Sequence, residues 1–167
     1  AWSFNYTDYW GTAVTAFELH EPHERLTVHA QGVVETHGDD LAWDLDRRVA
    51  PNDLGWAALR DRAVVDTMTE FLAVDERTQP ASELIELAAG TTQQPPRLAA
   101  LDVCALISDH LSYERGSTQV TSTAREVWEL GRGVCQDYSH VALGALRSIG
   151  LPARYVSGYL HSGGGEP

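Results

Sequence analysis

The sequence contains no lysine, and its twelve basic residues, all arginine, face 24 acidic residues. The resulting formal net charge of −12 disfavours binding to nucleic acid or to an anionic membrane surface. Only two cysteines are present, which argues against a disulfide framework and favours a reducing, cytoplasmic compartment. No apolar run approaches the roughly twenty residues of a membrane span, and no signal peptide is visible. We therefore expect a cytoplasmic protein that binds neither nucleic acid nor membranes.

The N-terminal part alternates apolar and polar residues in the manner typical of strands. Strands are expected within 1–9, 13–20 and 26–35. A glycine turn is expected at 9–12. This pattern predicts an antiparallel meander with one buried face. The acidic run 38–53, with a short strand at 41–45, is expected to end a β-rich region that covers residues 1–50.

A linking helical segment is expected over 51–96. Residues 54–62 fit a loop or a short helix, and 63–72 fit a helix or a strand. Ser82 is expected to be the N-cap of a helix closed by Gly90, followed by a Gln/Pro linker at 91–96.

Two further helices are expected before the chain reaches its second cysteine. An amphipathic helix of about four turns is predicted over 97–113, with Cys104 as a buried thiol in its apolar pattern. A shorter helix, capped by Thr123, is predicted to end at Gly131. Within it, Trp128 either is buried in the helix packing or lines a cleft.

The stretch 131–160 carries the chemistry that the residues themselves indicate. Gly131 and Gly133 approach Cys135 without side chains, and a helix of about 135–149 follows, ended by Gly150 and Pro152. A strand is predicted at about 153–160. Cys135 is thus expected at a helix N-terminus, where free N–H groups and the helix dipole favour the nucleophilic thiolate.

The helical periodicity also says which way Cys135 faces. At about 100° per residue, Ala142, Leu146 and Ile149 lie within about 40° of Cys135, so the thiol lies on the apolar stripe. Such a thiol is either a nucleophile at the rim of a packed seam or a small buried residue that caps the helix.

Four histidines are candidate bases or metal ligands. His140 lies about 140° around the helix from Cys135, so it is more plausible as a hydrogen-bonding structural residue than as a base. His161 could fold back toward the thiol, although nothing in the sequence forces it to do so. His20 and His23 form an HxxH pair, but Pro22 and the lack of further ligands argue against a zinc site.

The run GVCQD, the histidine at 140 and GLPARYVSGYL resemble the nucleophile segment of the transglutaminase-like superfamily, in its bacterial cysteine protease branch. The resemblance covers about thirty residues without a gap. The N-terminal segments DYWGT, FEL, PHERL and VHA are similar to the β-rich region that precedes the core in that branch. Thr12 stands where the branch usually has Asn.

The resemblance implies an α+β fold, in which an antiparallel β region precedes the helical half of a papain-like, transglutaminase-like core over 97–167. It also implies a Cys-His-Asp triad with Cys135 as nucleophile and backbone oxyanion donor. The family's His and Asp segments are not found before Pro167. The sequence is therefore expected to be a truncated domain, inactive by itself.

The implied reaction is acyl transfer from a peptide or protein through a Cys135 thioester, without a metal or organic cofactor. Gly133, Val134 and Trp128 are the expected substrate-binding residues. Hydrolysis is favoured over cross-linking, because nothing marks an amine-acceptor site. A non-catalytic binding or scaffold module is the alternative. Truncation is also expected to leave the strand at 153–160 with an open edge through which two chains could pair.

Overall fold

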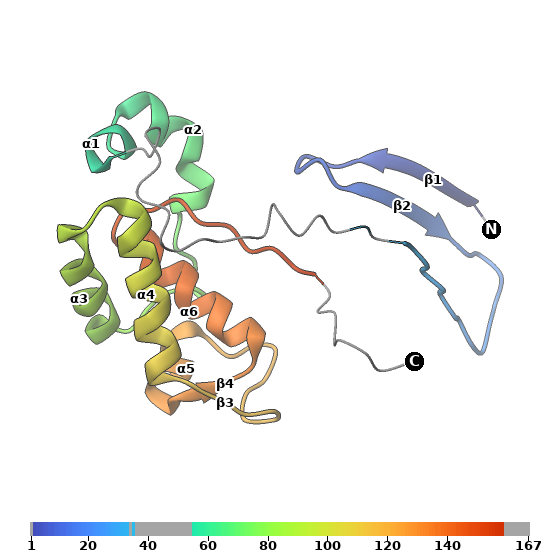
Figure 1. Cartoon of the computed structure of the whole chain (residues 1–167). Coiled ribbons are helices and arrows are strands. Elements are labelled where there is room, and N and C mark those ends of the chain that lie inside the picture. The colour runs from blue at the N-terminus through green and yellow to red at the C-terminus, as the bar shows by residue number, and fades with distance from the viewer. Residues whose placement is uncertain (1, 34, 36–54, 159–167) are drawn as a thin grey trace. The chain divides into compact units, whose positions relative to one another are not determined.

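The computed structural model describes residues 2–33, 35 and 55–158, and the chain divides into two compact units, Ala1–Asp44 and Leu45–Pro167. The first unit carries a β-hairpin and the second carries the helices (Figure 1). The expected α+β class is confirmed. The three-part division at residues 50 and 96 stays a prediction.

In the first unit, β1 (Trp2–Thr7) pairs with β2 (Ala13–Glu18) in antiparallel register. The carboxylate of Asp8 accepts hydrogen bonds from the backbone N–H groups of Trp10 and Thr12, each at 2.8 Å. Gly11 has a φ of 82°, a left-handed conformation that suits glycine. The glycine turn was therefore predicted correctly.

The expected third strand and the buried face were wrong for the described residues. Residues 26–33 and 35 form no strand, although Leu26 and Val28 alternate as strand residues do. On β1, Trp2 is 55% exposed and Phe4 is 44% exposed. A hairpin of two strands cannot bury a face by itself, because that requires a third strand or another packed element. The short strand expected at 41–45 lies outside the described residues.

The second unit is built from helices and one short strand pair. Its elements are α1 (Trp56–Leu59), α2 (Arg62–Leu72), α3 (Ser82–Gly90), the 3₁₀ helix η2 (Thr91–Gln93), α4 (Pro96–His110), β3 (Ser112–Tyr113), α5 (Ala124–Leu130), β4 (Arg132–Gly133) and α6 (Cys135–Ser148). The sequence left two alternative structures open for 54–62 and for 63–72. Both stretches contain helix. Within the expected linker 91–96, residues Thr91–Gln93 form a 3₁₀ helix, and Gln94 and Pro95 connect it to α4, whose first residue is Pro96.

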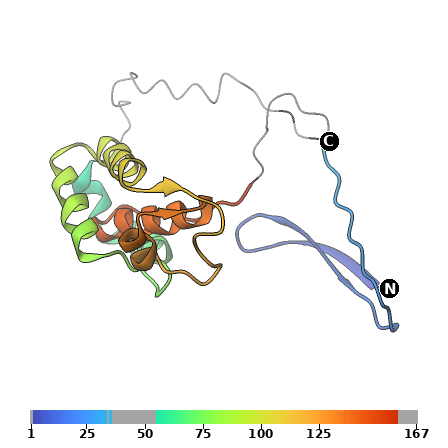
Figure 2. The same ribbon diagram turned by 90° about the horizontal axis from the view of Figure 1, so that it is seen from below.

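Helix α6 lies at the centre of this unit. It packs against α3, α4 and α5, and these helices surround it in Figure 2. The core that they share consists of Ala81, Leu84, Ala88, Val103, Ile107, Leu111, Ala124, Val127, Trp128, Val141 and Ala145. None of the helices in the described ranges has the length and apolar character needed to cross a bilayer.

Cys104 is exposed, contrary to expectation. The buried stripe of α4 runs through Ala99, Val103 and Ile107, which recur every fourth residue. Cys104 follows Val103 and is therefore turned about 100° away from that stripe.

The caps of the short helices follow the expected chemistry with one exception. Thr123 and Glu126 form a reciprocal capping box at the start of α5, and Gly131, with a φ of 70°, ends the helix. Ser82 was wrongly expected to be an N-cap. The residue with extended backbone before α3 is Ala81, and Ser82 is already the first helical residue.

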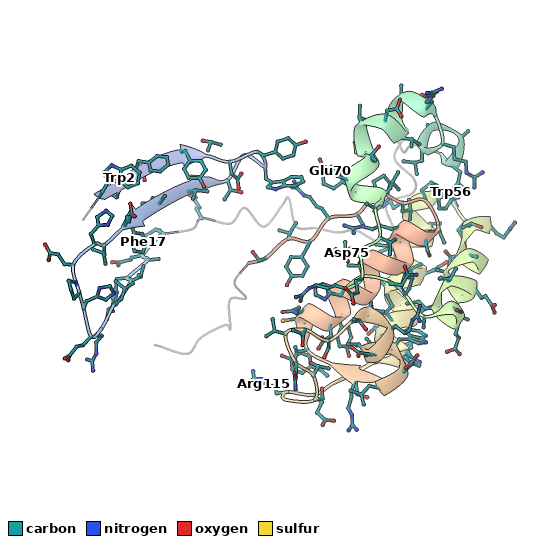
Figure 3. The ribbon with its side chains drawn as sticks, turned by 180° about the vertical axis from the view of Figure 1, so that it is seen from behind. Trp2, Phe17, Trp56, Glu70, Asp75 and Arg115 are labelled. Carbon is teal, nitrogen blue, oxygen red and sulfur yellow. The ribbon has the colours of Figure 1, made fainter. Side chains whose placement is uncertain are left out.

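The segment 73–81 between α2 and α3, here called the strap, contacts α6. The carboxylate of Asp75 accepts hydrogen bonds from the backbone N–H and the hydroxyl of Thr78, at 2.9 and 2.8 Å. Figure 3 labels Asp75 at this strap. The turn places the Thr78 carbonyl directly against Gly144 in the middle of α6. Glycine is needed there because a β-carbon would overlap that oxygen.

The chain leaves α6 through a glycine turn. Gly150, with a φ of 83°, donates its N–H to the Arg147 carbonyl, and Leu151 donates to the Leu146 carbonyl at 2.9 Å. These two bonds form a Schellman motif, so the expected stop at Gly150 is confirmed.

The strand expected at 153–160 is absent from the described residues up to 158. The Ala153 N–H donates to the Phe71 carbonyl, and the Arg147 guanidinium donates to the carbonyls of Ala153 and Ala73. This segment is tied to the end of α2 and to α6, and no described strand lies beside it to form a ladder. The open edge inferred for dimer formation is therefore not found in 153–158, and residues 159 and 160 lie outside the described residues.

Candidate active site

Cys135 is the first residue of α6, and its side chain is exposed. Val134 is the N-cap residue, with extended backbone. The glycine-rich approach, the helical periodicity after Cys135 and the glycine stop had indicated this position. The Cys135 sulfur is neither in the middle of a helix nor sealed in the core. Either arrangement would have excluded a nucleophile.

The backbone segment that leads into Cys135 is held by the buried carboxylate of Asp137, a residue that is 1% exposed. Its Oδ2 atom accepts a hydrogen bond of 2.7 Å from the Val134 N–H and one of 2.6 Å from the Thr118 hydroxyl. Gly133 leaves room for this carboxylate, since a β-carbon there would lie 2.7 Å from Asp137 Oδ2. The glycine thus allows the Asp137 carboxylate to pack against the backbone.

Two backbone N–H groups at the start of α6 remain available. Among the described residues, neither the Cys135 N–H nor the Gln136 N–H has an acceptor. A helix N-terminus leaves its first N–H groups unpaired and attracts negative charge. Negative charge is therefore favoured at this end of α6, next to the Cys135 sulfur.

A loop from residue 114 to 122 lies beside the first turn of α6. It begins after β3, which pairs in parallel with β4 just ahead of Cys135. The side chain of Gln136 donates to the Val120 carbonyl at 3.2 Å, and the Arg77 guanidinium donates to the same oxygen at 2.8 Å. Arg115 is labelled at the outer part of this loop in Figure 3. The position of this loop beside α6 could not be inferred from its own residues, because its contacts come from residues 77, 136 and 137.

The apolar stripe that carries Cys135 is only partly covered. Ala142, Leu146 and Ile149 are partly buried and pack against the core from its edge. The residues of α6 that are fully sealed, such as Val141 and Ala145, lie on the neighbouring face. Cys135 therefore lies at the rim of the packed helices.

Trp128 lies in a different place. Its ring is 4% exposed, stacks on the His110 ring at a centroid distance of 3.7 Å, and donates its indole N–H to Glu83 at 3.0 Å. One surface hollow is lined by Trp128, His110, Glu83, Arg125 and Glu129, together with Ala81 and Ser82. Cys135 is not among these residues, so the structure does not bring Trp128 together with the thiol.

The histidines do not complete a catalytic pair in the described residues, where no hydrogen bond joins a histidine to the Cys135 sulfur. The Nδ1 atom of His140 is buried without a hydrogen-bond partner there, contrary to the structural bond expected of it, and its ring lies 5.8 Å from that of Tyr155. His161 lies outside the described residues.

The HxxH pair contacts groups of its own turn. His20 approaches Glu18 at 3.5 Å, and the Nδ1 atom of His23 bonds the Glu21 carbonyl at 2.9 Å. Within the described ranges, no three His, Cys, Asp or Glu residues gather as metal ligands would.

The two thiols differ in their surroundings. Desolvation by the atoms of α4 and its neighbours raises the pKa of the Cys104 thiol above its ordinary value. Less of Cys104 is therefore present as thiolate at neutral pH, although the residue is exposed.

Residues 85–165 match the family model of the transglutaminase-like superfamily. The match begins within α3 and continues past the end of α6, so this part of the chain is similar to that superfamily.

The relatives found by sequence are mycobacterial. An uncharacterized protein of Mycobacterium leprae is 38% identical over 160 residues, which are 95% of this chain and 54% of that protein. Uncharacterized proteins of Mycobacterium bovis and Mycobacterium tuberculosis are 28% identical over 156 residues, which are 92% of this chain and 49% of each of them. The chain thus spans about half the length of the curated relatives it matches. No solved structure matches it.

Proposed function

We propose that this chain carries the nucleophile of a cysteine peptidase or amidase, which transfers an acyl group through a thioester on Cys135. The observation that carries the proposal is the exposed thiol at the first residue of α6, beside two unpaired N–H groups, within the transglutaminase-like segment. The class of reaction then follows from the chemistry of a thiolate next to oxyanion donors.

In the first step, the Cys135 thiolate attacks the carbonyl carbon of an amide. A carbon–sulfur bond forms, and the carbonyl electron pair moves to the oxygen, where the Cys135 N–H and the Gln136 N–H donate hydrogen bonds. The tetrahedral intermediate collapses to a thioester when the carbon–nitrogen bond breaks and the amine leaves with a proton from a general acid.

In the second step, water attacks the thioester and the Cys135 sulfur leaves. The products are a carboxylic acid and the free thiol. A histidine oriented by an aspartate moves the protons, and we propose that both lie in the part of the whole protein outside this chain. The greater length of the curated relatives is compatible with that assignment.

The two residues before the nucleophile are proposed to contact the substrate backbone. Asp137 accepts the Val134 N–H and so fixes the peptide that enters α6. Gly133 and Val134 are proposed to guide the substrate backbone past the thiol. Trp128 is proposed to contact substrate at its own hollow and not at Cys135.

Hydrolysis is proposed over cross-linking. The chain has no lysine, so it offers no side-chain amine as acyl acceptor for a second copy of itself. A peptide or protein is the proposed substrate, the cytoplasm is the proposed compartment, and a dimer of the whole protein remains a proposal.

A binding or scaffold module without turnover is the alternative. One observation favours it: β1 presents Trp2, Phe4 and Tyr6 on one face, with ring centroids 5.0 and 5.3 Å apart, and all three are exposed. Exposed aromatic rows of this kind bind protein partners in other systems.

The test uses the whole protein and a library of quenched fluorescent peptides. Amide hydrolysis is expected for the wild-type protein, with a loss of at least about 1,000-fold in Cys135→Ser and little change in Cys104→Ser. Hydrolysis that persists in Cys135→Ser contradicts the proposal. The chain described here, tested alone, is expected to be inactive, and hydrolysis that depends on Cys135 in this piece would place the base within it.

A further inference from the structure

The loop from 114 to 122 is held by three hydrogen bonds, two with the first turn of α6 and one with Arg77. Thr118 donates to Asp137 at 2.6 Å, and Gln136 donates to the Val120 carbonyl at 3.2 Å. The Arg77 guanidinium donates to the same carbonyl at 2.8 Å. Two of these anchors come from residues that directly follow Cys135 in the sequence. The loop therefore has a defined position next to the thiol.

The side chain of Val120 does not share in this anchoring. It is 74% exposed, while its backbone carbonyl accepts two hydrogen bonds. An exposed valine on a mobile loop needs no explanation. Here the backbone is held, and the adjoining residues Gln119 and Ser122 bond each other in a turn. An aliphatic group is thus presented from a fixed backbone beside a nucleophile.

We propose that Val120 and its loop flank the substrate bound at Cys135, and that Val120 contacts an apolar side chain of the substrate near the scissile amide. This proposal rests on the proposed function for its substrate and on the loop anchors for its position. Val120 is a specificity-determining residue in this account. The reacting groups are the Cys135 thiolate and the two N–H groups.

Position can be tested without a substrate, on this chain as it exists. The carboxylate reagent iodoacetate and the neutral reagent iodoacetamide both alkylate thiolates, so the ratio of their rates at Cys135 reports local charge. The Val120 carbonyl accepts a hydrogen bond from Gln136, which follows Cys135, so an arginine at position 120 would bring a positive charge toward the thiol. Salt at 0.1 M screens such a charge over about 10 Å. In Val120→Arg, we expect the iodoacetate to iodoacetamide ratio at Cys135 to rise about 3- to 10-fold, and to fall toward the wild-type ratio in 1 M salt.

Val74→Arg is the matched control. Val74 follows Ala73, whose carbonyl accepts a hydrogen bond from Arg147 in the last turn of α6. Arg147 is twelve residues from Cys135 along that helix, hence about 18 Å away. The ratio should not change in this variant. Val120→Asp should shift the ratio in the opposite direction, and it decides the question if Val120→Arg does not fold. If the ratio is unchanged in a folded variant, the inferred position of the loop beside Cys135 is wrong.

Specificity is tested in the whole protein with peptide substrates that differ in one side chain next to the scissile amide. Val120→Asp is expected to lower kcat/KM for a leucine-containing peptide relative to an arginine-containing peptide by at least about 10-fold. Unchanged selectivity overturns the specificity role. If the wild-type protein cleaves no peptide but the labelling ratio shifts as expected, the proposed function fails while the placement of Val120 beside Cys135 stands.

Discussion

The α-carbon of Gly144 faces the backbone carbonyl of Thr78, with no room for a side chain between α6 and the strap before α3. The hydrogen bonds from Thr78 to Asp75 hold that carbonyl in place. The strap and Gly144 together fix how deeply α6 sits in the helical unit. Because Cys135 begins the same helix, this contact also helps to place the thiol.

Gly144→Ala should destabilise the protein strongly. The added methyl group would overlap the Thr78 carbonyl, and relief requires α6 or the strap to move. The free energy of unfolding is expected to fall by about 2–3 kcal/mol, as in overpacked cores. Urea unfolding followed by circular dichroism measures it. Gly90→Ala is the control, since its β-carbon meets nothing within 4 Å and helix propensity favours alanine. Equal changes in unfolding free energy for the two substitutions would mean that the strap does not pack closely against α6.

Asp137→Ala should also destabilise the fold, for an electrostatic reason. It leaves the Val134 N–H and the Thr118 hydroxyl without their acceptor in a buried site. A loss of about 2–4 kcal/mol in unfolding free energy is expected, and Thr118→Val should cost about 1 kcal/mol. Asp66→Ala is the surface control, because Asp66 is exposed and its contact with Arg62 is 3.9 Å long. That control should change stability by less than about 0.5 kcal/mol. A loss in Asp137→Ala no larger than this would show that the carboxylate does not hold the approach to Cys135.

The two exposed cysteines should differ in reactivity. Desolvation raises the pKa of Cys104, so iodoacetamide at pH 7.5 is expected to label Cys135 at least about fivefold faster. Mass spectrometry of the digested protein gives both rates. In 8 M urea the difference should disappear, because unfolding removes the desolvation. Faster labelling of Cys104 in the folded protein would contradict an accessible thiolate at Cys135.

Stability should decrease at acidic pH in part through Asp75. Its hydrogen bonds with Thr78 lower the pKa of the carboxyl below its ordinary value of 3.8. A carboxyl with a lowered pKa in the folded state stabilises the fold above its ordinary pKa, and that stabilisation is lost as pH falls through the folded-state pKa. Below pH 4, the urea concentration at the midpoint of unfolding should therefore decrease as the pH falls. This decrease should be less steep in Asp75→Asn than in the wild type. Identical pH profiles would contradict this coupling.

Local sequence signals predicted the features that depend on local chemistry. The Thr123 cap, the glycine stops at 131 and 150, and the position of Cys135 at a helix start each depend on residues within a few positions of one another. The turn at Gly11 belongs to the same group. In all of them, a single residue type has a conformational or hydrogen-bonding preference that its neighbours do not override.

The features that the sequence did not predict depend on partners far along the chain. Segments 26–33 and 153–158 have strand-like residues, but a strand needs a neighbour to pair with, and no described strand lies beside either segment. Asp137 depends on Thr118, and Gly144 depends on Thr78, so neither role could be read from adjacent residues. A glycine inside a helical pattern was nevertheless a signal of close backbone approach, and Gly144 could have been identified in this way.

The central claim is that the Cys135 sulfur becomes acylated during turnover. The direct measurement is mass spectrometry of the whole protein after acid quenching, a few milliseconds to seconds after mixing with an activated ester or a cleavable peptide. The account predicts an acyl group on the peptide that contains Cys135, sensitive to hydroxylamine as thioesters are and absent in Cys135→Ser. Substrate turnover without that adduct, or an unchanged adduct in Cys135→Ser, would contradict it.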